Sequence, residues 1–248
     1  MRIVGTSKIA QKYLLLSTCI VVVLLSASAA QTSDDTSIFQ PNATPGEKAA
    51  ALNLQRSAKS GSAKAQSELS KAYMAGNIFK QNTPEAVRWV MAAANQGLAE
   101  AEVDLAVLYL QGTGIPQDYS KGFFWMKKAA DQHNPKAEYN LGLLYGLGRG
   151  VGKDIPEGIR WYLKSAESGN PQAAYSMGIA YEQGVGVSRD LVRAYMWHYL
   201  AANRFGYHPS QKPLQDLSVK IGPTKVEEGR QQAAAWIKAH SNVKPVSM

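Results

Sequence analysis

The side chains that most often perform chemistry in proteins are scarce and scattered in this sequence. Its 248 residues include one cysteine, Cys19, and four histidines: His133, His198, His208 and His240. No two histidines have the spacing of a helical zinc site, and no serine lies in a Gly-x-Ser-x-Gly turn. We therefore predict no catalytic residue, no metal site and no cofactor, and hence a protein that is not an enzyme.

Two of the histidines stand at positions where other parts of the chain carry ordinary residues. His133 is 36 residues from both Gly97 and Gly169, which indicates a turn position. His198 belongs to a series with the same step: Val90, Met126 and Tyr162. We interpret both as turn and helix-face residues.

The first thirty residues have the three parts of a secretory signal peptide. Basic residues come first, an apolar stretch follows over 13–25, and small residues fill 26–30. The apolar stretch is shorter than the roughly 20 residues that cross a bilayer. We predict a signal peptide over 1–30 that is cleaved after Ala29 or Ala30, with an uncleaved membrane anchor as the alternative.

Cleavage at this place determines the chemistry of the mature chain. It would remove Cys19, so that neither a disulfide nor a thiol nucleophile remains. No later stretch is long and apolar enough for a transmembrane segment. We expect an exported protein, either periplasmic or secreted.

The chain is only mildly basic once the predicted signal peptide is set aside. The whole sequence has 27 Lys and Arg against 19 Asp and Glu, a net charge of +8. Three basic and no acidic residues precede residue 31, which leaves 24 against 19, or +5. No basic cluster is interleaved with aromatic residues, so we expect no nucleic acid partner.

Several residue types recur at steps of 36. The tryptophans are Trp89, Trp125, Trp161 and Trp197, and the tyrosines are Tyr73, Tyr109, Tyr145 and Tyr181. The same register holds for Leu69, Leu105, Leu141 and Met177, for Ala65, Ala101, Ala137 and Ala173, and for Gly76, Gly112, Gly148 and Gly184. A fixed period of this length is typical of proteins built from stacked repeats, and we expect the tryptophans and tyrosines to form their core.

Each unit contains two stretches with the periodicity of a helix. Ala137, Leu141 and Tyr145 are four residues apart, which places them on one face of a helix. The small pair Ala129-Ala130 follows Trp125 at the same spacing. Asparagine-proline pairs indicate helix starts and alternating glycines indicate helix ends. The pattern predicts an all-α protein of helix-turn-helix hairpins.

This unit resembles the Sel-one-like repeat (SLR) family, a relative of the tetratricopeptide repeats. The matching residues are clearest in one unit: Ala137, Leu141, Gly142, Tyr145, Gly148, Gly150, Val151, Asp154, Trp161 and Tyr162. The resemblance implies a right-handed α-solenoid, a superhelix with a 36-residue period, and an exported bacterial member of the family. The four units would span 62–97, 98–133, 134–169 and 170–203.

The sequence predicts capping segments at both ends of the repeat array. The polar, proline-containing stretch 31–43 predicts a flexible tether, and 44–61 predicts an N-terminal capping helix that opens with Thr44 and Glu47. Residues 204–248 predict a loop followed by C-terminal capping helices, with Trp236 as their anchor.

The resemblance also implies which residues contact a partner. In tetratricopeptide arrays the first helices line the concave surface, at positions two before and two after the leucine series. Together with two neighbouring leucines, these positions form an apolar stripe: Val103, Val107, Leu110, Tyr139, Leu143, Leu147, Tyr175 and Ile179. An exposed stripe of this kind indicates a partner surface, unless neighbouring helices or the C-terminal helix cover it.

The function implied by the resemblance is a non-enzymatic adaptor or scaffold of the bacterial envelope, which binds a peptide or protein segment on its concave face. One alternative is an envelope enzyme or accessory subunit acting on cell-wall material, which would need His133, His198 and acidic groups in one cleft. The other is binding of an anionic glycan or lipid by a basic convex face. Its residues would be Lys127, Lys128, Arg149, Lys153, Arg160, Lys164, Arg189 and Arg193.

Overall fold

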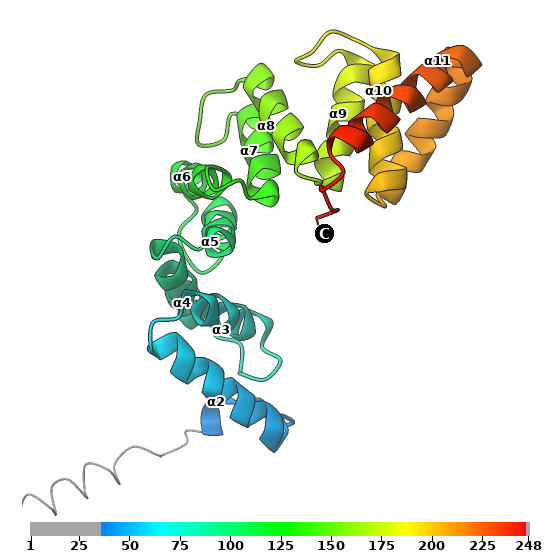
Figure 1. The fold of residues 1–248 in the computed structure, drawn as a ribbon. Helices are drawn as coiled ribbons and strands as arrows, with labels where there is room; N and C mark the ends of the chain where they lie inside the picture. Colours follow the sequence, from blue (N-terminus) through cyan, green and yellow to red (C-terminus); the bar gives the residue numbers. More distant parts are fainter. Residues whose placement is uncertain (1–35, 247–248) are drawn as a thin grey trace, which may run out of the picture.

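The computed structural model describes residues 36–246, which form an arch of stacked helices (Figure 1). The predicted signal peptide over 1–30 lies outside the described residues. The first helices of the four hairpins are α3 (Ala63–Ala75), α5 (Ala99–Gln111), α7 (Pro135–Leu147) and α9 (Pro171–Gln183). The second helices are α4 (Thr83–Asn95), α6 (Tyr119–Ala130), α8 (Ile155–Glu167) and α10 (Leu191–Tyr199).

The predicted fold class is confirmed. Each helix packs mainly against its neighbours along the chain, so the hairpins stack in sequence order. Within residues 36–246 there is no β-strand, and the one β-type contact there is an isolated bridge between Phe39 and Phe79. The structure is an all-α array of helical hairpins with a repeat of about 36 residues.

The helix ends follow from the local sequence. The Asn134 side chain accepts hydrogen bonds from the backbone N–H groups of Lys136 and Ala137, and so caps α7. Gly148 ends the same helix with a φ of 68°, a left-handed conformation that favours glycine. A glycine in the left-handed conformation ends each of the four first helices, and each of these helices is 13 residues long.

The two helices of each hairpin approach closely at one small residue of the first helix. This residue is Ser70, Ala106, Gly142 or Gly178 in successive units. A Cβ atom at Gly142 would lie 2.6 Å from Cδ1 of Tyr162 and 2.9 Å from the backbone oxygen of Gly158. A Cβ atom at Gly178 would lie 2.7 Å from the His198 ring. The absence of a side chain therefore makes room for a ring from the second helix.

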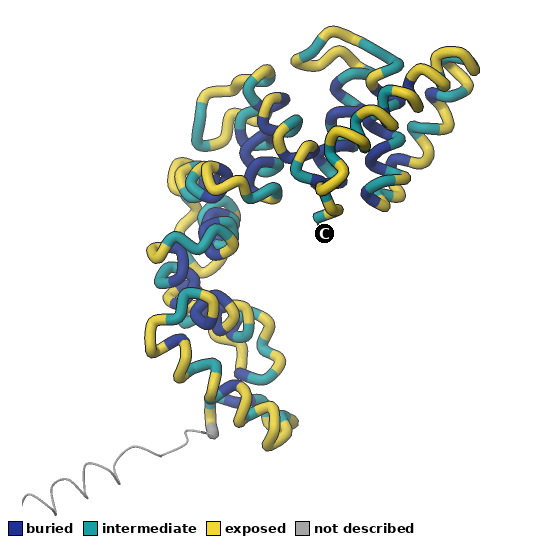
Figure 2. Tube along the Cα trace, in the orientation of Figure 1, coloured by how far each residue is buried: buried dark blue, intermediate teal, exposed yellow. Residues whose placement is uncertain are grey.

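The core follows the arch as a series of adjoining clusters (Figure 2). Trp89, Trp161 and Trp197 are buried, and Trp125 is half-buried. The ammonium group of Lys164 lies 4.1 Å from the centre of the Trp161 ring. The periodic tryptophans therefore belong to the core that joins successive helices.

Polar side chains recur beside this core. Gln66, Glu102 and Glu138, one per unit, are buried near the starts of the first helices. Gln96 donates to Oε1 of Gln66 at 2.7 Å, and Gln132 donates to Oε2 of Glu102 at 2.7 Å. Each pair ties the start of a first helix to the end of its second helix. Such buried groups need partners because unpaired ones are costly.

The N-terminal flank differs from the predicted flexible tether. The Phe39 ring is buried and stacks on Phe79 with ring centres 5.3 Å apart. Gln40 N–H donates to Ile78 O at 2.7 Å, and Lys80 N–H donates to Ile38 O at 2.7 Å. Residues 38–40 are anchored because the one aromatic ring of this polar stretch fills the end of the core. The capping helix, α2 (Pro45–Lys59), follows with the predicted box of Thr44 and Glu47.

The C-terminal flank also differs in detail from its prediction. The chain continues after α10 in a π-helical turn (Leu200–Arg204), most of which falls within the predicted fourth unit, and then in a 3-10 turn (His208–Ser210), where the sequence predicts a loop. The next helix, α11 (Gln211–Ala239), is interrupted by non-helical backbone at Gly222, immediately before Pro223. Trp236 contacts Trp197 and Phe205, at ring-centre distances of 6.0 and 5.8 Å.

The close approach inside the third hairpin can be tested with an alanine. We expect Gly142→Ala to destabilise the protein by about 1–3 kcal/mol in urea unfolding, because the new methyl group overpacks the contact with Tyr162. Gly146→Ala in the same helix is the control. No atom lies within 4 Å of its Cβ position, so better helix propensity should stabilise the protein by up to about 1 kcal/mol. Equal stabilisation by both alanines would contradict the proposed contact.

The buried Glu138 predicts a pH-dependent stability. Burial raises the pKa of this carboxyl above its ordinary value, although the charges of His133 and Lys164 oppose the shift. The folded state then holds the proton more tightly than the unfolded state, so the free energy of unfolding falls as pH rises through the raised pKa. We expect Glu138→Gln to melt at a higher temperature than the parent at pH 7, and the difference to shrink as pH falls toward the ordinary pKa.

The exposed Glu68 provides the matched control for this measurement. Glu68→Gln should change the melting temperature little at either pH because its side chain is in water. A Glu138→Gln protein that melts below the parent at pH 7 would show that attraction to the cations outweighs burial.

Candidate functional site

The ionisable side chains do not converge on a catalytic site. Among residues 36–246 no three His, Asp or Glu side chains are arranged to hold a metal ion. The exposed His133 ring lies 4.0 Å from Glu138, between the second and third hairpins. His198 is fully buried in α10. The described residues therefore do not bring the two histidines and acidic groups into one cleft.

His198 has the environment of a packing residue. Its ring contacts the ring of Tyr175 and occupies the space above Gly178, and its Nδ1 lies 3.5 Å from the Ser210 hydroxyl. Burial lowers the pKa of His198 to about 4, so the ring is neutral at pH 7. Its Nε2 atom has no hydrogen-bond partner among the described residues. This histidine serves the hairpin as Tyr162 does in the preceding unit.

The surface is hollowed where the starts of the first helices meet. One hollow of about 240 Å³ lies between α7 and α9, and an adjoining hollow of about 340 Å³ lies between α5 and α7 and extends to α3. Lys136 and Val246 line both. We call this pair of hollows the groove. A third hollow of about 220 Å³ lies between α3 and α5 and is lined by apolar residues such as Met74 and Val107.

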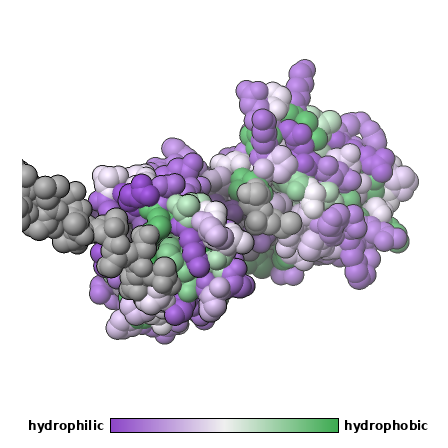
Figure 3. Space-filling model, turned by 90° about the horizontal axis from the view of Figure 1, so that it is seen from below, coloured by the Kyte–Doolittle hydropathy of each residue, from purple (hydrophilic) through white to green (hydrophobic). Residues whose placement is uncertain are grey.

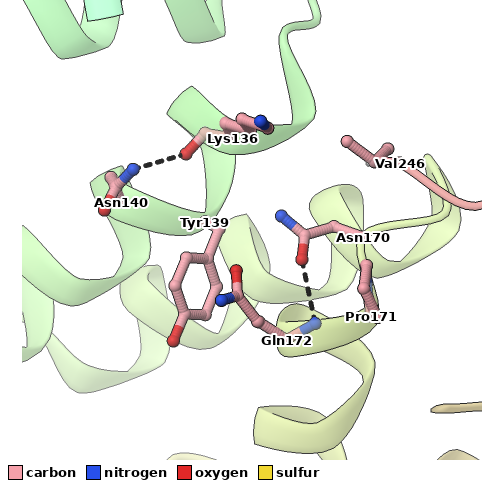
Figure 4. A pocket seen from close by; sticks show the side chains of 7 residues that line it. All are labelled: Lys136, Tyr139, Asn140, Asn170, Pro171, Gln172 and Val246. Carbon is pink, nitrogen blue, oxygen red and sulfur yellow. Dashed lines mark hydrogen bonds between the residues drawn. The ribbon is translucent and has the colours of Figure 1, made fainter. Parts of the chain in front are cut away.

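The α7–α9 end of the groove presents polar groups that can hydrogen-bond a ligand (Figure 4). Asn140 donates to the backbone oxygen of Lys136 at 2.8 Å. The Tyr139 ring and the Gln172 side chain lie next to each other, and no hydrogen bond joins the polar end of either to another of the residues drawn. Hydroxyl and amide groups both donate and accept, so they can pair with a peptide backbone.

The α3–α5 side of the groove has charges of both signs. The Lys71 ammonium lies 3.4 Å from Asp104 and 3.9 Å from Glu100. Burial raises the pKa of Asp104 above its ordinary value, and attraction to Lys71 opposes part of that rise. This mixture provides no net charge that would select a strongly acidic or strongly basic ligand.

The predicted partner residues do not form one continuous stripe. Val103, Val107, Tyr139 and Ile179 line four different hollows. Seen from below, apolar residues form separate stretches between hydrophilic ones (Figure 3). These four residues therefore contribute to separate hollows and not to one continuous apolar surface.

The other four predicted partner residues differ in exposure. Leu110 packs against α6, where a Cβ atom at Gly122 would lie 2.5 Å from it. Tyr175 packs against His198 and against Tyr207, with ring centres 5.4 and 5.3 Å apart. Leu143 is half-buried, whereas Leu147 is 59% exposed. Partner binding by the eight residues stays a prediction.

The polar residues of the groove were not predicted from the sequence. Several of them hold the same position in successive units, namely Glu100, Lys136 and Gln172, and likewise Asp104 and Asn140. The residue type changes at each step, so no series of like residues marks these positions, whereas the buried series Gln66, Glu102 and Glu138 was detectable from its similar residues at a 36-residue step. Val246 reaches the groove from outside the repeats.

Most of the basic residues assigned to a convex face have local partners. Lys127 pairs with Asp131 at 2.7 Å, Lys128 with Glu102 at 2.9 Å, Arg160 with Glu157, and Arg193 with Asp190 at 3.5 Å. Arg149 and Lys164 lie over Tyr119 and Trp161. These contacts offset or occupy much of the positive charge on the second helices.

None of the helices in residues 36–246 combines the length and the apolar character that crossing a bilayer requires.

Comparison with known proteins identifies the family. The Sel1 repeat model matches residues 63–98, 99–134, 135–170 and 171–204, which is more than half of the chain. The chain therefore belongs to the Sel1 repeat family, and the resemblance noted in the sequence is confirmed. No curated protein matches it.

Two solved structures resemble the chain over most of its length. One is a protective antigen present in uropathogenic Escherichia coli strains, which displays an SLR fold. It is 37% identical with a TM-score of 0.67, and the match covers 77% of this chain and 40% of that protein. The other is a Sel1 repeat protein from Oxalobacter formigenes, 28% identical with a TM-score of 0.66, and the match covers 75% of this chain and 78% of that protein. The chain thus spans well under two thirds of the E. coli protein.

Proposed function

We propose that this Sel1 repeat protein is a non-enzymatic adaptor or scaffold, which binds a peptide or protein segment in the groove on the concave side of the arch. The observation that supports this most is the groove itself, where the polar groups of Tyr139 and Gln172 line one hollow and apolar contacts such as Val103 line the next. Sel1 repeat proteins are largely non-catalytic binding proteins, in agreement with this proposal.

The dimensions of the groove favour an extended segment. Hollows of about 240 and 340 Å³ accommodate individual side chains and not a folded domain. Packed helices lie about 8–10 Å apart, whereas an extended chain rises about 3.3 Å per residue. One step between neighbouring helices would thus match about three residues of the ligand.

We also propose that the protein acts in the bacterial envelope after export, in the periplasm or as a secreted protein. The support for this is the arrangement of residues 1–30, in which basic, apolar and small residues follow in the order of a signal peptide.

The two alternative functions lack comparable support. The enzyme would need His133 and His198 in one cleft, whereas His198 is buried and packs against Tyr175. Binding of an anionic glycan or lipid would need free positive charge, whereas residues such as Lys127 and Lys128 contact carboxylates. Neither alternative is favoured by a specific observation.

Site-specific photocrosslinking in the producing bacterium tests the proposed surface. Lys136 is exposed and lines both hollows, so p-benzoylphenylalanine at this position should yield a discrete crosslinked protein. Phe124 is the matched control, because it is an aromatic residue of α6 that is 58% exposed and lines neither hollow. The same photoreactive residue there should yield no such product.

Two results would contradict this proposal. Identical products from both positions would indicate nonspecific contact. A product from a probe at Lys153 and none from Lys136 would assign binding to the basic loops instead. Circular dichroism of each variant verifies that the helices are intact.

A further inference from the structure

The chain turns back into the concave side of the arch after α11. Figure 1 shows this last segment, in red, entering the bend beside α9. The Val243 N–H donates to the backbone oxygen of His240 at 3.0 Å and closes a turn. Arg204 Nη2 donates to the backbone oxygen of Val243 at 2.8 Å, and the Val246 N–H donates to the backbone oxygen of Gly169 at 3.0 Å. We call residues 241–246 the tail.

The tail uses a space that exists because residue 169 is a glycine. Gly97, His133 and Gly169 hold the same turn position in successive units, each with a positive φ. No atom lies within 4 Å of a Cβ position at Gly97, whereas one at Gly169 would lie 2.2 Å from the backbone oxygen of Lys244. His133 shows that the turn itself accepts a side chain. A side chain at 169 would therefore expel the tail without removing the turn.

The tail also fills part of the groove. The Val246 side chain lines both hollows and lies at the edge nearest Asn170 and Pro171 (Figure 4). Val243 packs against the apolar cluster that contains Trp236. Two valines three residues apart thus hold the tail on the arch, and backbone hydrogen bonds fix its path.

We propose that the tail is an intramolecular ligand of the groove, and that the partner is an extended segment that displaces it. This inference rests on the proposed function, since it assumes that the groove binds a segment of chain. The partner would place β-branched apolar side chains at the positions of Val243 and Val246 and hydrogen-bond to Gly169 and Arg204. The partner can bind only to molecules whose tail is undocked. The apparent affinity is therefore the intrinsic affinity multiplied by the undocked fraction.

A peptide supplied in trans tests the proposal. The probe is a fluorescein-labelled peptide with the sequence of residues 241–248, and the readout is fluorescence anisotropy with the full chain. The double variant Val243→Ser, Val246→Ser should release its own tail and bind the probe at least tenfold more tightly than the parent. Lys244→Ser is the matched control, because this side chain is exposed, and it should bind like the parent.

A second substitution tests the path of the probe. Gly169→Ala, added to the double variant, should weaken probe binding at least tenfold, because its Cβ would clash with the position of the Lys244 backbone oxygen. Gly97→Ala, added to the same double variant, should leave binding unchanged, because its Cβ meets no atom. Both alanines impose similar strain on a turn with positive φ. A difference in peptide binding between the two variants is therefore due to the clash of the methyl group that Gly169→Ala adds with the bound peptide.

The proposal is overturned if the double variant binds the probe no better than the parent, or if Gly169→Ala has no effect on binding. A parent dimer that dissociates in the double variant, measured by sedimentation, would also overturn it, because the tail would then occupy a second copy. If a partner still crosslinks at Lys136 but the labelled peptide does not bind, only the proposal that the tail occupies the groove is refuted, and the adaptor function stands. Probe binding without any Lys136 crosslink would instead count against the adaptor function.

Discussion

The structure depends on how closely the two helices of each hairpin approach. At Gly142 and Gly178 the first helix has no side chain, and a ring of the second helix occupies that space. The earlier units carry Ser70 and Ala106 at this position, and the same register of their second helices holds Val90 and Met126, which have no ring. A glycine on the first helix thus accompanies a ring on the second, and a larger residue accompanies a side chain without a ring. A protein interior packed as densely as a crystal allows few other combinations.

The groove follows from this arrangement of hairpins. Once each hairpin has a fixed spacing, the starts of α5, α7 and α9 are brought side by side, and the hollows form between them. A buried glutamine or glutamate in each of the first three units closes the same end of the hairpin, as Glu102 does with Gln132. The groove is therefore a consequence of the repeat and not of any single residue.

The periodic part of the structure was predictable from the sequence, whereas the contacts that break the period were not. The tryptophan series predicts the number and order of the hairpins, and residues such as Asn134 predict where individual helices begin. The sequence predicts that Leu110 and Tyr175 belong to an apolar stripe but leaves open whether other helices cover it. Each packs on a neighbouring element, Leu110 over Gly122 of α6 and Tyr175 on His198 of α10. The spacing of one helix does not reveal what its neighbour places against it.

The segments on either side of the repeat array also make contacts that periodicity does not predict. Phe39 is a single aromatic residue in a polar stretch, and its contact with Phe79 spans 40 residues. The tail contacts Gly169 across more than 70 residues. Neither segment has a period from which its position could be inferred.

Amide hydrogen exchange of the intact chain, with and without an excess of the peptide 241–248, measures whether the tail occupies the groove and whether a second segment can displace it. We expect the Val246 amide to be protected in the chain alone, because it donates to Gly169, and to lose that protection when the peptide takes its place. The amides of α7 and α9 should remain protected throughout. A Val246 amide that exchanges at the rate of an unfolded chain before peptide is added, or that stays protected while the peptide binds, would contradict the account.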